Sequence, residues 1–243
     1  MFKVEDIAKK EHNLVLDARQ EYGEVYKVAV DYLELSWELF SKIKPEAQIF
    51  AITLGQAKSS NYLALLSILR HHLIQAKLNM RVSYESTIIA CYSLVNNEIE
   101  KILSEGYPSI DQFRKDEKDF KKDAYTWIEN NYKSHSDRIK NSKNNINKGF
   151  AHSAFSTSVL NHLSKETSAS TSFFDVSIHS TKEGHLDVIT NLLHFSFSIN
   201  SQLDFVTDVL KDYPLVTIID DYEDRKELLF EKLMTLSVEP EYL

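Results

Sequence analysis

Hydrophobic positions in the first part of the chain follow the period of a helix. Within residues 11–44, apolar or small side chains recur at alternating intervals of four and three, at Tyr22, Tyr26, Ala29, Leu33, Ser36, Phe40 and Ile43. This spacing places them on one face of an amphipathic helix. Leu35 and Trp37 widen the stripe, so we expect a core helix that is buried on more than one side.

A second helical region is expected over residues 46–104. Pro45 suits the first turn of a helix, and leucines at helical spacing continue the apolar pattern behind it. The pattern weakens near residues 55–60 and again near Asn79. We therefore expect the region to be broken at those two places.

The middle of the chain is more polar. Ser109 is a favoured N-cap for a third helix that runs to about Tyr132. The narrow apolar stripe of this helix is typical of a position on the outside of a bundle. Residues 133–147 are rich in Ser, Asn and Lys and could form a loop or a frayed continuation of this helix. We favour a loop, which leads into a helix over residues 150–163.

The last third begins with a change of character. Residues 164–184 lack apolar periodicity and predict a loop-rich insertion, apart from a short extended segment over residues 173–178. The helical pattern returns over residues 186–210. After Pro214 interrupts it, a final helix is expected over residues 215–236.

Composition favours the same fold class. The 243 residues include only 5 Gly and 4 Pro, whereas an all-β protein needs many tight turns built from these residues. No internal repeat or domain boundary is evident. The sequence therefore predicts a single domain over residues 1–243: an all-α, antiparallel bundle of five to seven helices with a loop-rich insertion near 164–184.

Charge and hydropathy limit the possible cellular locations and binding partners of the protein. The net charge of −8 argues against a general nucleic-acid-binding protein. Residues 133–148, however, contain five bases and one acid and could bind an anion. The N-terminus lacks the apolar segment of a signal peptide, and no run of 18 apolar residues occurs. We expect a cytoplasmic protein with no membrane partner.

Common catalytic and metal-binding motifs are missing from the sequence. Neither Glu-x-x-His nor His-x-x-x-His occurs, although the chain has nine histidines. Glycine-rich phosphate loops and a Gly-x-Ser-x-Gly elbow are absent too. Cys91 is the only cysteine and lies in an apolar run typical of a buried structural residue. We predict no metal site and no cofactor.

Arg81 and Glu85 form a candidate polar pair. Their spacing of four residues places both on one face of a helix, within reach of a salt bridge. One interpretation is a structural ion pair in a crowded bundle. The other is a polar site between helices, because charges are costly to bury.

The segment Asn147-Lys148-Gly149-Phe150-Ala151-His152 combines an amide, a cation and an imidazole. It resembles the signature of HEPN domains, helical bundles common in prokaryotic toxin and abortive-infection systems. In that family an Arg and a His lie near a dimer interface, and active members are metal-independent ribonucleases. Here Ile146, or Asn147 at the shortest spacing, stands where the family has its Arg. Lys148 could supply a cation, without the bidentate fork of Arg.

Three functional hypotheses follow. The first is a non-catalytic or weakly catalytic, homodimeric HEPN-like protein of phage defence or toxin control, which binds RNA or a partner protein through residues 133–152. Its binding cations would be Arg138, Lys140 and Lys143. The second, implied by the resemblance, is a ribonuclease in which His152 moves the proton and Asn147 and Lys148 assist. The third is a structural or regulatory scaffold.

The simplest structural interpretation of the same segment needs no activity. In it, Asn147 caps the start of a helix and His152 forms hydrogen bonds inside the bundle. Gly149 then only permits a close approach of two backbones.

Overall fold

The chain folds into an all-α bundle, as the sequence predicts. The computed structural model describes residues 3–96, 109–149, 162–168, 171–176 and 184–238. Within these ranges it contains seven α-helices, one short 3-10 helix and four short strands. Among the described helices, none combines the length and the apolar character that crossing a lipid bilayer requires.

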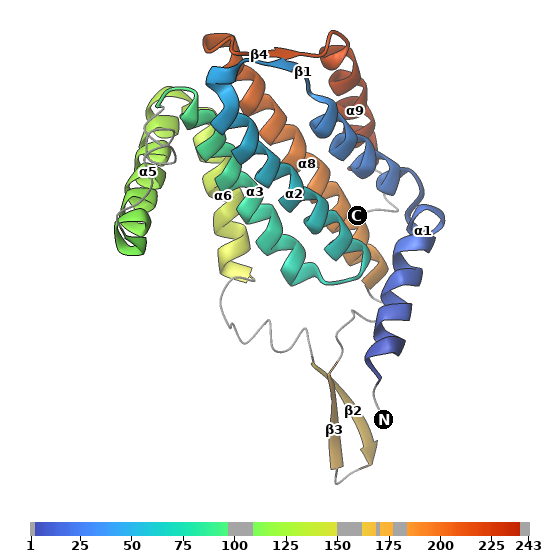
Figure 1. The fold of residues 1–243 in the computed structure, drawn as a ribbon. Helices are drawn as coiled ribbons and strands as arrows, with labels where there is room; N and C mark the ends of the chain where they lie inside the picture. Colours follow the sequence, from blue (N-terminus) through green and yellow to red (C-terminus); the bar gives the residue numbers. More distant parts are fainter. Residues whose placement is uncertain (1–2, 97–108, 150–161, 169–170, 177–183, 239–243) are drawn as a thin grey trace.

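The first helix, α1 (Val4–Glu38), is kinked at Gly23. Its second half buries much of the predicted stripe, including Ala29, Leu33 and Ser36. The helix ends at Glu38 instead of residue 44, because the next residues form strand β1 (Phe40–Ile43). β1 pairs antiparallel with β4 (Val216–Ile218), and the pair closes one end of the bundle (Figure 1).

Residues 45–93 form a helical hairpin. The 3-10 helix η1 (Pro45–Ala47) leads into α2 (Gln48–Leu69), which packs along α3 (Leu73–Ser93). The chain turns at residues 70–72, so the breaks predicted near 55–60 and 79 were wrong. The turn contains no Gly or Pro; instead His71 adopts a φ of 61°, a conformation that His tolerates better than most side chains.

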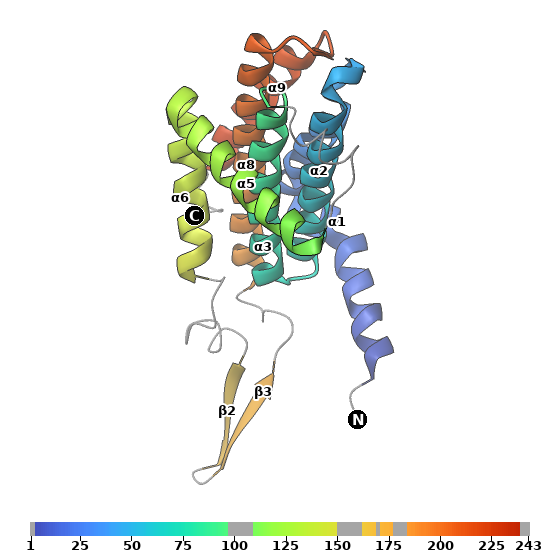
Figure 2. The same cartoon turned by 60° about the vertical axis from the view of Figure 1, so that its left-hand side comes forward.

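Helix α5 (Ile110–Asn131) confirms the third predicted helix. The Ser109 hydroxyl accepts a hydrogen bond from the backbone N–H of Gln112 at 3.1 Å, as an N-cap should. Figure 2 shows α5 on the outside of the bundle, which agrees with its narrow apolar stripe.

The loop predicted over residues 133–147 is in fact helix α6 (Lys133–Gly149). Over residues 133–146, its buried side chains are His135, Ser136, Ile139 and Ile146. Two of the four are polar, so the buried face has too few apolar residues to be recognised from hydrophobic periodicity. His135 is held by Asp208, with Nε2 and Oδ2 2.8 Å apart.

The predicted insertion contains a β-hairpin. Strand β2 (His162–Ser168) pairs antiparallel with β3 (Thr171–Val176). β3 confirms the short extended segment, whereas β2 replaces the end of the helix predicted over 150–163; residues 150–161 lie outside the described ranges. Thr, Phe and Val favour strands when a partner strand is present. The hairpin extends beyond one end of the bundle in both views (Figures 1 and 2).

Helix α8 (Gly184–Asp212) is the centre of the fold, in contact with α1, α2, α3, α6 and α9 (Tyr222–Leu236). A buried amide also joins it to its neighbours. Gln202 Oε1 accepts hydrogen bonds from Asn61 Nδ2 at 3.1 Å and from Ser83 Oγ at 2.6 Å. The final helix begins at Tyr222 instead of residue 215, because residues 216–218 are paired in β4.

Candidate functional site

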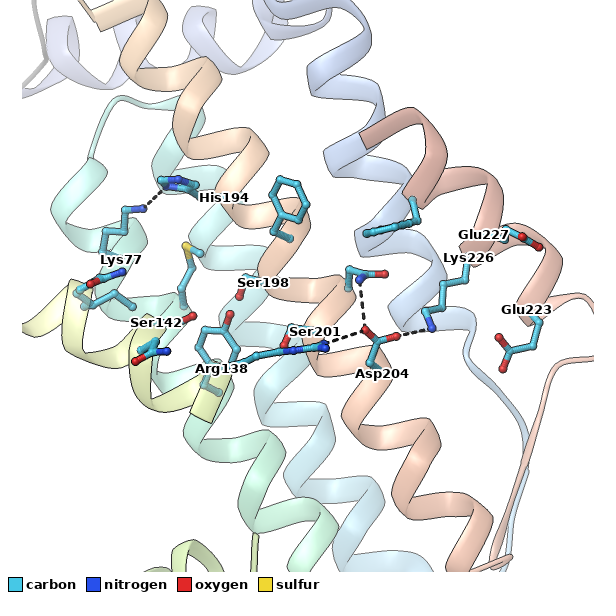
Figure 3. Close-up of a pocket in the computed structure, with 18 residues that line it drawn as sticks. Lys77, Arg138, Ser142, His194, Ser198, Ser201, Asp204, Glu223, Lys226 and Glu227 are labelled. Carbon is cyan, nitrogen blue, oxygen red and sulfur yellow. Dashed lines mark hydrogen bonds and ion pairs between the residues drawn. The ribbon is translucent and has the colours of Figure 1, made fainter. Parts of the chain in front are cut away.

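A cavity of about 1010 Å³ lies between α3, α6, α8 and α9. Helix periodicity explains its polar lining. On α6 the lining residues include Arg138, Asn141, Ser142 and Asn145, which recur at intervals of three and four. On α8, His194, Ser198 and Ser201 follow the same rule (Figure 3), while the opposite side of the helix is in the core. Polar faces of separate helices therefore meet at the hollow.

One part of the cavity has balanced charges around Asp204. Its carboxylate lies 3.7 Å from the Arg138 guanidinium and forms an ion pair with Lys226. The Asn200 amide also donates to it at 3.4 Å. Glu223 on α9 lines the same region (Figure 3). The cations of Arg138 and Lys226 are therefore largely compensated by carboxylates.

The other part contains a lysine–histidine pair. Lys77 Nζ lies 3.3 Å from Nδ1 of His194, and both residues line the cavity. None of the carboxylates in the described ranges forms an ion pair with Lys77. Lys77 is half-buried, and this desolvation lowers the pKa of its ammonium to about 8.

The pKa of His194 is lowered in the same way as that of Lys77. Desolvation by surrounding protein atoms, and secondly the charge of Lys77, lower the pKa of the His194 imidazole. His194 is nevertheless exposed to solvent on part of its surface. A neutral imidazole next to an ammonium is the expected state near neutral pH, because two adjacent cations repel each other.

Apolar side chains complete the walls. Met80, Ile146, Phe197 and Phe230 line the cavity together with the polar groups. Met80 and Ile146 are themselves buried. A cavity with a few polar groups set in apolar walls is typical of sites for small organic molecules.

The structure separates the three cations predicted for binding. Arg138 lines the cavity, but Lys140 forms an ion pair with Glu129 of α5 at 2.8 Å. Lys143 contacts Glu85 of α3 at 2.8 Å and also the Tyr125 hydroxyl. The three cations of the predicted basic strip, all on α6, are therefore paired with carboxylates of three different helices, α8, α5 and α3. Of the three, only Arg138 lines the cavity.

The predicted pair of Arg81 and Glu85 belongs to a larger ion cluster. Arg81 Nε lies 3.2 Å from Glu85, and Lys121 and Lys143 contact the same carboxylate at 2.5 and 2.8 Å. Burial raises the pKa of the Glu85 carboxyl, but hydrogen bonds and charges of the two lysines outweigh it and bring the pKa to about 2. The cluster joins α3, α5 and α6 and lies outside the cavity lining.

The HEPN-like segment begins where the α6 wall of the cavity ends. Asn145 and Ile146 line the cavity, and Asn147 and Lys148 follow in the last turn of α6. Asn147 therefore does not cap the start of a helix, contrary to the simplest interpretation. His152 lies outside the described residues, so its catalytic role stays a prediction.

No metal-binding group was found in the described part of the chain, where no three His, Cys, Asp or Glu side chains are close enough to hold an ion. Cys91 is fully buried, and burial raises the pKa of its thiol. A buried thiol of raised pKa is a poor nucleophile.

Sequence reasoning missed Lys77, His194, Asp204 and Lys226. These residues come from α3, α8 and α9, and Lys77 and His194 are 117 positions apart. One signal was available: His194, Ser198 and Ser201 repeat at intervals of three and four within an otherwise apolar helix. Such a polar row predicts a polar face, although not its partners.

Comparison with models of known protein families found no match for this sequence. Searches among curated proteins and among solved structures found no match either.

Proposed function

We propose that the protein binds a small organic anion in the cavity between α3, α6, α8 and α9. The proposal rests on one observation above all. Lys77 presents an ammonium group to this cavity beside His194, and no carboxylate among the described residues neutralises it. An acidic group of the ligand would supply the missing negative charge.

The energetics of Lys77 favour an anionic ligand. Desolvation of an ammonium is unfavourable unless a hydrogen-bonded counter-charge compensates it. With a pKa of about 8, Lys77 is still mostly protonated at about pH 7. An anion bound beside Lys77 would raise its pKa again, so binding and protonation strengthen each other.

The walls and the volume favour an organic ligand. Met80, Ile146 and Phe197 offer apolar contact to a carbon skeleton. Ligand cavities usually measure roughly 300–1,000 Å³, so this one is large enough for a drug-sized molecule. The carboxylates of Glu223 and Glu227 line the opposite part and would accept hydrogen bonds from hydroxyl or amino groups of the ligand.

RNA binding through residues 133–152, as expected of a HEPN-like protein, has less support. Lys140 and Lys143 are already paired with Glu129 and Glu85. The net charge of −8 would also repel a polyanion. The ribonuclease hypothesis depends on His152 and stays a prediction, as does the homodimer.

Titration with anilinonaphthalene sulfonate (ANS), an aromatic anion that fluoresces in apolar sites, tests the proposal. At about pH 7 we expect saturable binding, weakened about tenfold by Lys77→Met, because a charge-assisted hydrogen bond contributes about 1.5 kcal/mol. Lys58→Met is the matched control. Lys58 also has a pKa of about 8, but it lies outside this cavity.

The control should bind ANS as the wild type does, and circular dichroism should show both variants folded. Equal affinity of the wild type and Lys77→Met would overturn the proposal. Anisotropy of a fluorescent RNA oligonucleotide, measured on the same samples, tests the RNA hypothesis separately. Salt-sensitive RNA binding that is lost in Arg138→Glu would favour that hypothesis instead.

A further inference from the structure

We infer that Lys77 forms an imine with the carbonyl carbon of a bound aldehyde or oxo acid, with His194 as the proton acceptor. The inference rests on the proposed function and specifies its ligand class: an organic anion that also carries a carbonyl group. It assigns Lys77 a covalent role that ion pairing alone does not require.

The geometry places the two reacting groups of the protein together. Lys77 comes from the first turns of α3 and His194 from α8, and both side chains line the same cavity (Figure 3). Nζ lies 3.3 Å from Nδ1, close enough for a proton to pass between the nitrogens with little movement. Nδ1 accepts this proton in the tautomer that carries its hydrogen on Nε2.

The environment keeps the amine available. Only the unprotonated amine attacks a carbonyl, and desolvation lowers the pKa of Lys77 from 10.5 to about 8. At about pH 7 its unprotonated fraction is then roughly 300 times that of an ordinary lysine. The other charged groups of the cavity are Arg138 on α6, Asp204 on α8, and Glu223, Lys226 and Glu227 on α9. Asp204 pairs with Arg138 and Lys226 and not with Lys77.

The proposed step balances without any further reagent. His194 accepts a proton from the Lys77 ammonium, the Nζ lone pair attacks the carbonyl carbon, and His194 returns this proton to the carbonyl oxygen. His194 then takes a second proton from Nζ and gives it to the carbinolamine hydroxyl, which leaves as water while the protonated C=N bond forms. One water leaves, and nothing is oxidised or reduced.

Lys58 shows why a lowered pKa is not sufficient. Burial lowers its pKa to about 8 as well. Its ammonium, however, donates to the Trp37 carbonyl oxygen at 3.3 Å and lies 4.8 Å from the centre of the Phe40 ring. The neighbouring void measures about 20 Å³, which is room for a water molecule and not for a carbonyl compound. Lys58 is therefore an internal control: its pKa is about the same as that of Lys77, but it has no room for a ligand beside it.

Reductive trapping with glyoxylate, the smallest aldehyde acid, tests the inference. The whole protein is incubated at about pH 8 with glyoxylate and cyanoborohydride, which reduces an imine to a stable carboxymethyl group on the lysine. Peptide mapping by mass spectrometry then gives the rate at each lysine. We expect Lys77 to be labelled at least about ten times faster than Lys58 and than the exposed Lys118.

Two variants separate the imine from simple binding. Lys77→Arg keeps the positive charge but has no amine of suitable pKa, so it should bind ANS and lose the label. His194→Gln should slow labelling of Lys77 several-fold and leave labelling of Lys118 unchanged.

Labelling of Lys77 no faster than that of Lys58 or Lys118 would overturn the inference. If glyoxylate still displaces ANS from the wild type in that case, the proposed function stands and only the imine fails. If Lys77→Met binds ANS like the wild type, the proposed function fails as well.

Discussion

Glu85 is the residue at which most of the charged contacts between α3, α5 and α6 meet. Its side chain is 16% exposed and accepts from Lys121 and Lys143 on the two neighbouring helices. Removing the charge leaves two half-buried ammonium groups without a counter-ion. We expect Glu85→Gln to lower the free energy of unfolding by about 2 to 3 kcal/mol near neutral pH, as measured by urea denaturation.

The pH dependence of that loss has a defined sign. Because the folded pKa of Glu85 is depressed to about 2, its contribution is full above the unfolded value of about 4.3 and declines as the pH falls. The difference between the wild type and Glu85→Gln should therefore shrink by about half at about pH 3. Glu129→Gln, which removes an exposed partner of Lys140, should have little effect. A difference for Glu85→Gln that does not change with pH would contradict the cluster.

For contacts between individual residues, the sequence predicts only those within one helix. The spacing of Arg81 and Glu85 was sufficient to predict their salt bridge, which the structure contains. Lys121 and Lys143 come from other helices, and no local spacing relates them to Glu85. The same limit applies to Lys77 and His194.

The kink in α1 is the clearest element-scale feature. Gly23 has φ 49° and ψ −124°, a combination open almost only to glycine. Replacing it with alanine should cost about 1 to 2 kcal/mol, because the helix must strain or straighten and lose its contacts on one side. Urea denaturation of Gly23→Ala measures this cost.

Gly55→Ala is the matched control, and it should change stability in the opposite direction. Gly55 lies inside α2, where an added Cβ would meet nothing within 4 Å. Alanine favours a helix interior over glycine, so this variant should be stabilised by about 0.5 to 1 kcal/mol. If Gly23→Ala were stabilised as well, the kink would not require glycine.

Helices with a hydrophobic stripe or a capping residue were predicted well, and helices without them were not. α5 followed from Ser109 and a narrow stripe, and α8 from regular apolar spacing. α6 lies where the sequence predicts a loop, because His135 and Ser136 occupy half of the buried positions over residues 133–146. Such a helix is stabilised by its neighbours and not by its own apolar pattern, so local reasoning fails there.

For the whole molecule, the all-α bundle was predictable and the cavity was not. Scarce Gly and Pro with long periodic segments predict the fold class, but a cavity depends on how the helices pack against each other. Of the three cations predicted for binding, Arg138 is the one that lines the cavity. The prediction rested on the local excess of bases in residues 133–148, and it could not show that Lys140 and Lys143 would be paired.

The pH dependence of ANS affinity shows whether the Lys77 ammonium is the anion-binding group of the cavity. ANS remains anionic at every pH of this series, and desolvation and the charge of Lys77 lower the pKa of the His194 imidazole, away from the pKa of Lys77. Affinity of the wild type should be constant below about pH 7 and fall at least about fivefold as the pH rises through 8, where Lys77 loses its proton. Lys77→Arg should bind equally well across that range, because arginine stays charged. Identical pH profiles for the two proteins would contradict this role of Lys77.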